Sequence, residues 1–325
     1  MKAIQYKKYG GPEVAGVAAV NTPLPKKTEL LVRVYASTVN RTDAGFRSAE
    51  YFVSRFWSGL FKPKYKVLGC EFSGIIEFVG DSVTNFKVGD EVFGYNDKTF
   101  GGHAEFLTIN ADGAVAIKPS NISVYDAAAI TEGAHYALNI IRAAKVRKGN
   151  EVLVYGASGA IGSAAVQLLL AQQINATAVC NTKNVERLRS LGLKTVIDYE
   201  KTDFTQIGKT FDFVFDAVGK SSFAACKELM KPNGCYISTE LGNNGENIFL
   251  AIKHALFGHH KKVRFPIPPD LVQEDVNYLK ELVQIGKFRP LIDSYRTMED
   301  IVDIYRYVDS GKKTGNVILK IVEDL

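Results

Sequence analysis

A buried strand that runs through closely spaced glycines into a helix is the feature that most restricts the fold of this chain. The stretch reads VLVYGASGAIGSAA, and its glycines stand at 156, 159 and 162. Gly159 lets the backbone approach a phosphate, and Gly162 lets the helix pack closely on the strand. A helix N-terminus offers pyrophosphate unpaired N–H groups and a positive dipole end. The residues predicted to bind a dinucleotide here are Ser158, Gly159, Ala160 and Ile161.

The context of this turn decides between a nucleotide site and a turn that only packs. The spacing is A-x-G-x-x-G, with Ala157 in place of the first glycine of the usual pattern. From about residue 120 onward, apolar strands alternate with helical stretches, which indicates βαβ units on a parallel sheet. A glycine pattern at the first strand-to-helix turn of such units favours the nucleotide site.

The first part of the chain has a different pattern. Short β-type runs such as ELLVRVYAST and GIIEFVG alternate with Gly, Pro, Asn and Asp, which is typical of a mostly antiparallel β domain. The last segments could return to complete that domain. We therefore predict two domains in an α/β protein. Residues 1–121 and 266–325 form the β-rich domain, and residues 122–265 form the doubly wound parallel-sheet domain.

Composition is ordinary for a soluble globular protein. The 40 Lys and Arg residues against 35 Asp and Glu give a net charge of +5, and the short basic runs at 261–264 and 311–313 are read as solvated surface rather than a nucleic-acid site. Four cysteines without a C-x-x-C pair do not form a disulfide framework. The N-terminus has no apolar signal region, and no apolar run reaches membrane-span length. We expect a cytoplasmic protein that does not enter a membrane.

The end of the strand after the glycine turn predicts which dinucleotide binds. An NAD site places an acid there for the ribose hydroxyls, whereas an NADP site places a cation and hydroxyls for the 2′-phosphate. The stretch ATAVCNTKNV, residues 176–185, contains no acid, and it presents Asn181, Thr182 and Lys183. We predict NADPH as the cofactor. The alternative for Lys183 is an ordinary exposed lysine at the start of a helix.

Several motifs in order along the whole chain resemble the medium-chain dehydrogenase/reductase superfamily, and within it the zinc-free quinone oxidoreductase-like reductases. They are VNRTDAGFR, LGCEFSGIIEFVG, FKVGDEVFGY, GGHAEFLTI, KVRKGNEVLVYGASGAIGSAAVQL and SGKKTGNVILKI. The resemblance implies a GroES-like substrate domain, a Rossmann cofactor domain, a cleft between them and a homodimer.

The resemblance also bears on metal binding. Zinc-dependent relatives carry a cysteine where this chain has Asn40, a histidine where it has Cys70, and a third ligand near Ile130–Thr131. A catalytic zinc needs about three protein ligands and an open position. The cysteine-rich lobe for structural zinc is also missing. We predict no metal site, and interpret Cys70 as a packing residue near the nicotinamide. A reactive thiol remains the alternative.

Without zinc, the acceptors that remain accessible are quinones and α,β-unsaturated carbonyls, which accept hydride without a strong Lewis acid. The chain would then supply orientation and a hydrogen bond to the developing oxygen anion. Asn40 and Tyr51 are the predicted catalytic donors, while His135 is read as a structural histidine. Beyond the glycine turn and residues 181–183, the cofactor contacts implied by the resemblance are Asn40, Thr131, Tyr199, Val218 and Leu241.

The predicted function is therefore transfer of hydride from NADPH to a quinone or enone. One alternative is an enoyl-type reductase that acts on a specific biosynthetic intermediate. The other is a non-catalytic NADPH-binding protein, such as a nucleic-acid binder, which the dispersed charges disfavour.

Overall fold

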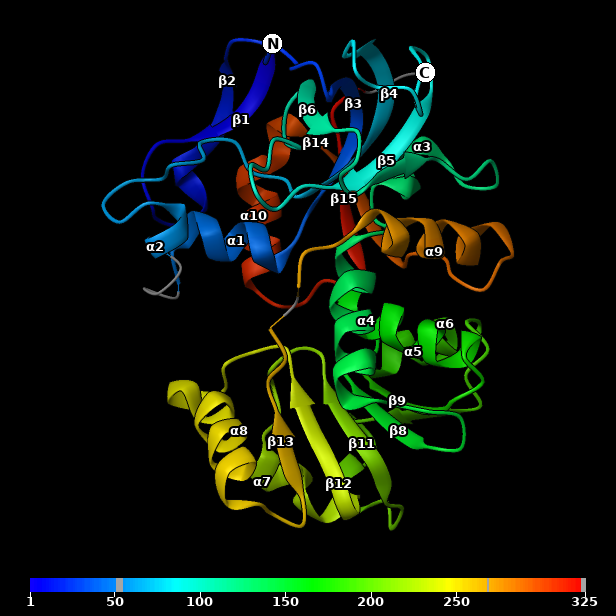
Figure 1. Cartoon of the computed structure of the whole chain (residues 1–325). Coiled ribbons are helices and arrows are strands. Elements are labelled where there is room, and N and C mark those ends of the chain that lie inside the picture. The colour runs from blue at the N-terminus through cyan, green and yellow to red at the C-terminus, as the bar shows by residue number, and fades with distance from the viewer. Residues whose placement is uncertain (51–54, 268, 323–325) are drawn as a thin grey trace. The chain divides into compact units, whose positions relative to one another are not determined.

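The computed structural model describes residues 1–50, 55–267 and 269–322 (Figure 1). The chain divides into two compact units, which are described separately below. The first unit comprises Met1–Glu132, Leu271–Gln284 and Ile292–Leu325, and the second comprises Gly133–Asp270 and Ile285–Leu291.

The first unit is built on a seven-stranded, mostly antiparallel sheet. Its strand order is β14-β15-β3-β4-β5-β7, and β6 pairs with β3 beside this path. A separate two-stranded ribbon joins β1 (Lys2–Tyr6) and β2 (Ala15–Ala19). The strands of the large sheet are β3 (Glu29–Val39), β4 (Glu71–Val79), β5 (Glu91–Tyr95), β6 (Phe106–Asn110), β7 (Val115–Ile117), β14 (Ile292–Thr297) and β15 (Asn316–Lys320).

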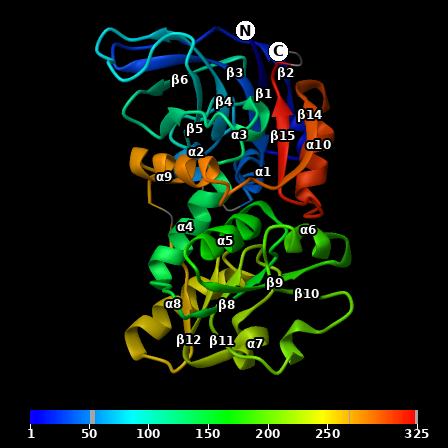
Figure 2. The same cartoon turned by 90° about the vertical axis from the view of Figure 1, so that its right-hand side faces the viewer.

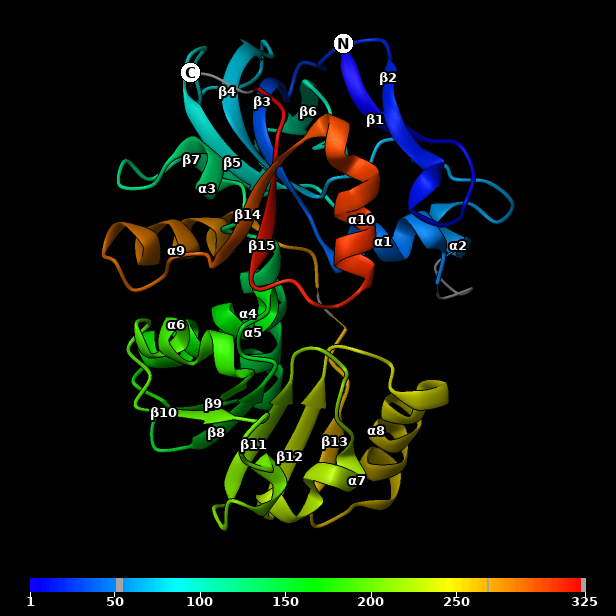
Figure 3. The same cartoon turned by 180° about the vertical axis from the view of Figure 1, so that it is seen from behind.

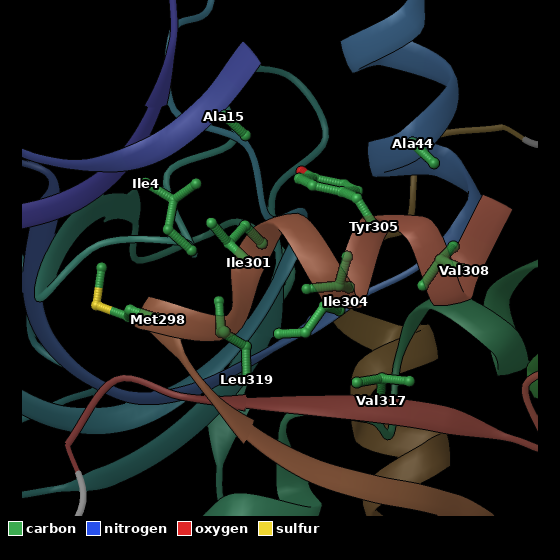
Figure 4. Packing of buried hydrophobic residues seen from close by; sticks show 11 residues of the cluster. Ile4, Ala15, Ala44, Met298, Ile301, Ile304, Tyr305, Val308, Val317 and Leu319 are labelled. Atoms are coloured by element: carbon green, nitrogen blue, oxygen red, sulfur yellow. The ribbon is translucent and has the colours of Figure 1, made fainter. Parts of the chain in front are cut away.

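One core of this unit joins the two ends of the chain. Helix α10 turns buried apolar side chains at i, i+3, i+4 and i+7 toward β15, the spacing of one helix face. Figure 4 shows this face against Val317 and Leu319, with Ile4 and Ala15 on the other side. The helices of the unit are α1 (Arg41–Ser48), α2 (Arg55–Ser58), α3 (Val124–Ala127), α9 (Gln273–Gln284) and α10 (Ile301–Asp309).

The second unit is a six-stranded parallel sheet with the order β10-β9-β8-β11-β12-β13. The chain runs outward from the centre twice, first through β8, β9 and β10 and then through β11, β12 and β13, which is the doubly wound pattern of dinucleotide-binding folds. The strands are β8 (Glu151–Tyr155), β9 (Asn175–Cys180), β10 (Thr195–Asp198), β11 (Phe211–Asp216), β12 (Met230–Ser238) and β13 (Lys262–Arg264).

Helices cover both faces of the parallel sheet. Right-handed crossovers that start in opposite directions from the centre place α5 and α6 on one face and α7 and α8 on the other (Figures 2 and 3). The centre of the sheet is fully buried at Val152, Leu153 and Val154. The helices are α4 (Glu132–Ala144), α5 (Ala160–Ala171), α6 (Val185–Arg189), α7 (Phe223–Cys226) and α8 (Glu246–Phe257).

The predicted fold class is confirmed, since a mostly antiparallel β unit accompanies a doubly wound parallel-sheet unit. The compact units differ from the predicted boundaries at two places. Residues 122–132 belong to the first unit, because α3 packs on β3 and β4. Residues 266–270 and 285–291 belong to the second unit, where the Gln167 side chain exchanges two hydrogen bonds with the Arg289 backbone, both of 2.9 Å.

Two other expectations concern thiols and membranes. All four cysteines are free and buried, in keeping with the predicted lack of a disulfide framework. Among the described residues, no helix combines the length and apolar character that crossing a membrane requires.

We expect Gly162→Ala to destabilise the second unit. A β-carbon at this position would lie 2.2 Å from the Gly156 carbonyl oxygen and 2.8 Å from the Ala157 α-carbon. These backbone atoms can make room only if α5 shifts against β8. Such overpacking lowers the free energy of unfolding by about 1–3 kcal/mol. Urea denaturation followed by circular dichroism measures the change.

Gly16→Ala is the matched control, because a β-carbon there meets nothing within 4 Å. Equal denaturation midpoints for Gly162→Ala and the wild type would contradict the close packing of α5 on β8.

Candidate functional site

The glycine turn between β8 and α5 has the geometry that a pyrophosphate requires. Gly156 adopts a positive φ of 75°, and Gly159 stands at the N-cap of α5 in an extended conformation. Residues 158–161 are partly exposed, whereas 162–169 are buried. The first N–H groups of the helix therefore reach solvent at the residues predicted to bind the cofactor.

The loop after β11 lies against this turn and is ordered by a buried aspartate. A β-carbon on Gly156 would meet the Val218 side chain at 2.6 Å, so Val218 covers the turn. Asp216 accepts hydrogen bonds from the Val218 and Gly219 amides through Oδ1, and from the Ser221 amide and the Tyr236 hydroxyl through Oδ2. Asp216 is not among the predicted site residues, although it is an acid at the end of an apolar strand.

The end of β9 carries the predicted 2′-phosphate residues together with two carboxylates. Thr182 donates its hydroxyl to Asp198 Oδ2 at 2.7 Å and its amide to Glu200 Oε2 at 3.0 Å. Asp198 ends β10 and Glu200 follows it, and β10 pairs in parallel with β9, so these acids lie outside residues 176–185 although they reach the same place. Lys183 is exposed here, and Lys201 lies 3.5 Å from Asp198.

In the first unit, Asn40 and Asp43 open a cluster of buried polar side chains. Asp43 caps the start of α1 by accepting from the backbone N–H of Asn40 at 2.9 Å, and it also accepts from the backbone N–H of Gly69 at 3.0 Å. Burial raises the pKa of Asp43 to about 6, while these amide hydrogen bonds and the nearby Lys313 oppose the shift. Asp43 therefore joins α1 to the turn that precedes β4.

Glu71 is the centre of this polar cluster. Its Oε1 accepts from Thr38 Oγ1 at 2.5 Å and from Asn40 Nδ2 at 3.1 Å. Its Oε2 accepts from the Thr131 amide, the Thr131 hydroxyl and the Glu132 amide at 3.2, 2.8 and 2.8 Å. Burial, followed by the Glu132 carboxylate, raises the pKa of Glu71 to about 8, and the donors lower it.

Glu132 connects Asn40 with Cys70. Its Oε2 accepts from Asn40 Nδ2 at 2.9 Å and from Cys70 Sγ at 3.2 Å. Burial and the neighbouring Asp43 raise the pKa of Glu132, and burial followed by the Glu132 charge raises the pKa of Cys70 well above its ordinary value. Cys70 is therefore a buried protonated thiol, which disfavours the reactive-thiol alternative.

Lys313 completes the cluster from the loop before β15. Its Nζ donates to Asn40 Oδ1 at 3.0 Å and to the Gly315 carbonyl at 2.7 Å. Burial lowers the pKa of Lys313, and the carboxylates of Glu132 and Asp293 oppose that shift. The interpretation of residues 311–313 as solvated surface is therefore wrong for Lys313, because a buried side chain from a distant segment binds it.

The remaining predicted residues lie in different parts of the structure. Thr131 lies in the cluster, with its hydroxyl on Glu71, and His135 is buried on α4. Tyr199 is exposed after β10, and Leu241 is partly exposed after β12. Tyr51 lies outside the described residues, so its catalytic assignment stays a prediction.

Two family models match the chain. The alcohol dehydrogenase GroES-like domain matches residues 26–119, and the zinc-binding dehydrogenase model matches residues 191–319.

Relatives extend over nearly the whole chain. The trans-enoyl reductase pgmF of Aspergillus terreus is 30% identical and covers 93% of this chain and 91% of its own. The 2-methylene-furan-3-one reductase of Solanum lycopersicum is 28% identical, over 98% of this chain and 79% of its own. The structure of the quinone oxidoreductase from Coxiella burnetii superposes with a TM-score of 0.87 at 26% identity and covers 99% of each chain.

One of these models is named for zinc, and three residues of the polar cluster lie close enough together to be compared with a zinc site. Asp43, Cys70 and Glu132 bring one ligand atom each to within 4.8 Å of the others. Both Asp43 oxygens accept backbone amides, and Glu132 Oε2 accepts from two donors. One of the two donors on Glu132 is the side-chain amide of Asn40, whose N–H hydrogen points toward this group and would repel a cation. A catalytic zinc needs unprotonated ligands and an open position, so these residues do not fit it.

Proposed function

Because the chain belongs to the medium-chain dehydrogenase/reductase superfamily, in its quinone oxidoreductase-like branch, we propose that it transfers hydride from NADPH to a quinone or an α,β-unsaturated carbonyl without a metal ion. The observation that carries the proposal is the buried polar cluster. Hydrogen bonds from Asn40 and Cys70 engage the carboxylate that a cation would need. A Lewis acid is thereby replaced by hydrogen-bond donors.

The relatives favour conjugated acceptors. The proteins similar to this chain include a 2-methylene-furan-3-one reductase, a trans-enoyl reductase and a quinone oxidoreductase. Enones and quinones accept hydride at a position conjugated with a carbonyl, and negative charge then develops on oxygen. A protein that orients the acceptor and stabilises that oxygen can catalyse this reaction without zinc.

Residues of both units have roles in this proposal. A bound nicotinamide cofactor would supply the hydride. The amides at the start of α5, with Gly159 and its neighbours, bind the pyrophosphate, and Val218 packs over the turn. Tyr51 is a proposed polar group at the acceptor, Asn40 orients the polar cluster beside it, and water supplies the proton.

The first test is oxidation of NADPH by chelator-treated protein, with 1,4-benzoquinone and a short aliphatic enone as separate acceptors. We expect turnover with both, and the same rate within twofold before and after removal of metal. Cys70→Ala should keep at least half of the activity, because the thiol only packs and donates to Glu132. Activity that returns only after zinc is added would overturn the metal-free proposal.

The choice of NADPH over NADH is a finer proposal, supported by Lys183 at the end of β9. Its exposed ammonium is available to a 2′-phosphate, and the Thr182 hydroxyl could turn from Asp198 toward the same group. The Glu200 carboxylate opposes this choice, because its Oε2 lies 3.0 Å from the Thr182 amide and would repel a phosphate.

Substitutions at these two positions should shift cofactor preference in opposite directions. Lys183→Ala should weaken NADPH binding by about tenfold and leave NADH binding within twofold, because only NADPH carries the phosphate. Glu200→Gln should tighten NADPH by about threefold, because it removes a like charge and keeps an acceptor for the Thr182 amide. Fluorescence titration of both cofactors measures these changes, and equal losses for the two cofactors would contradict the assignment of Lys183.

A homodimer is a further part of the proposal, and it is supported by one edge of the second unit. Strand β13 is the last strand in the order of the parallel sheet. Helix α8 packs beside it and exposes Phe249, Ile252 and Leu256, which lie on one helix face. An apolar stripe next to an open sheet edge is a surface that a second copy can cover.

Sedimentation velocity tests this surface. We expect the wild type to sediment as a dimer at micromolar concentration, and Leu256→Glu to sediment as a monomer, because a charge would be buried in the interface. Leu24→Glu, at a leucine of the first unit that is also largely exposed, should remain dimeric. A dimer that persists in Leu256→Glu would place the interface elsewhere.

We also propose a cytoplasmic location. The support is that the four cysteines are free and buried, as expected in a reducing compartment.

A further inference from the structure

The polar cluster of the first unit carries several acids and one hydrogen-bonded ammonium group. The carboxylates of Asp43, Glu71 and Glu132 are at most 4% exposed. His103 is also buried, and burial lowers its pKa to about 4, so it adds no positive charge at neutral pH. The Lys313 ammonium hydrogen-bonds to this cluster through Asn40. Buried carboxylates require such a counter-charge.

Lys313 differs from the rest of the cluster in its exposure. Asn40, Cys70 and Thr131 are 3%, 1% and 0% exposed, whereas Lys313 is partly exposed. The Lys313 ammonium therefore brings the positive charge of this cluster to its solvent boundary. Two of its ammonium hydrogens are directed by the Asn40 side chain and the Gly315 carbonyl, and an ammonium has three.

The amide of Asn40 has no hydrogen to spare for an acceptor. Its Nδ2 lies within 3.1 Å of three oxygens, those of Thr38, Glu71 and Glu132, and it has two hydrogens to share among them. Its Oδ1 accepts from Lys313. The amide is therefore oriented by the carboxylates on one side, and it orients the ammonium on the other.

We propose that the Lys313 ammonium is the catalytic group that donates a hydrogen bond to the acceptor oxygen as negative charge develops on it, and that Asn40 positions Lys313. This inference rests on the proposed function and assigns the oxygen-binding group within it. Hydride adds to the conjugated carbon of an enone, and the π electron pair moves to the carbonyl oxygen, which becomes an enolate. Lys313 keeps its proton throughout. Water then protonates the α-carbon, so the acceptor gains one hydride and one proton.

The neighbouring residues provide a matched set of variants. Lys313→Met removes the charge and the donor at nearly constant length, Lys313→Arg retains a cation with displaced N–H groups, and Lys312→Met changes the adjacent exposed lysine. Loss of a single oxyanion donor costs about 10²–10³-fold in kcat. We expect that loss for Lys313→Met with an aliphatic enone, a partial recovery for Lys313→Arg, and a change within twofold for Lys312→Met.

Two readouts separate this role from a structural one. The loss with benzoquinone should be about tenfold or less, because a quinol anion needs less stabilisation than an enolate, and a disturbed fold would affect both acceptors equally. NADPH affinity of Lys313→Met should match that of Lys312→Met, whereas its thermal midpoint should fall, because the buried carboxylates lose their counter-charge; the rates are therefore compared at a temperature at which both variants are fully folded. Equal losses for the two acceptors, or an enone kcat within threefold of the wild type, would overturn the assignment.

A ligand titration tests Lys313 independently of turnover. 4-Nitrophenol resembles an enolate when ionised and changes its absorbance, so its pKa in the NADP-loaded protein can be followed directly. We expect ionisation about one pH unit lower in the wild type than in Lys313→Met. The same pKa in both proteins would reject Lys313 as the oxygen-binding group. If the wild type lowers the pKa of 4-nitrophenol as expected but turns over neither acceptor, the proposed acceptors are rejected and Lys313 remains the anion-binding group.

Discussion

The buried carboxylate of Glu71 is the interaction on which the first unit's polar cluster depends. It accepts five hydrogen bonds, and these come from three segments: the end of β3, the start of α1 and residues 131–132. Removal of such an acceptor leaves each buried donor unsatisfied, at about 1–3 kcal/mol apiece. The positions of Asn40, Thr131 and Glu132 are therefore set together, and they cannot be changed one at a time without cost.

The chemistry of the cluster follows from how its negative charge is neutralised. A metal ion would neutralise the carboxylates and release protons from its ligands. In this structure the Cys70 thiol keeps its hydrogen and donates it to Glu132, and the Lys313 ammonium donates to Asn40. A metal ion polarises a substrate oxygen strongly enough for the oxidation of alcohols. Hydrogen-bond donors polarise it less, and they suffice when conjugation spreads the negative charge that develops on the acceptor.

The sequence predicts the elements that repeat local rules. The glycine spacing, the alternation of strands and helices and the change of pattern near residue 120 were sufficient for both fold types. The site was less accessible, because its contacts join segments far apart in the chain. Lys313 and Asn40 are 273 positions apart, and nothing local in GKKTG distinguishes Lys313 from the exposed Lys312. Asp198 and Glu200 were missed for a similar reason, since parallel pairing of β10 with β9 brings them to Thr182.

The two sites differ in how they are built, and this affects how each can change. The dinucleotide turn is made mainly of backbone, so it tolerates Ala157 where a glycine is usual, provided that Gly156 keeps its positive φ and Gly162 its missing β-carbon. The polar cluster is made of side chains that share protons, so one substitution alters the charge of several neighbours. A substitution of Asn40 is therefore tenable only together with compensating changes at the residues that it contacts, which are Glu71, Glu132 and Lys313.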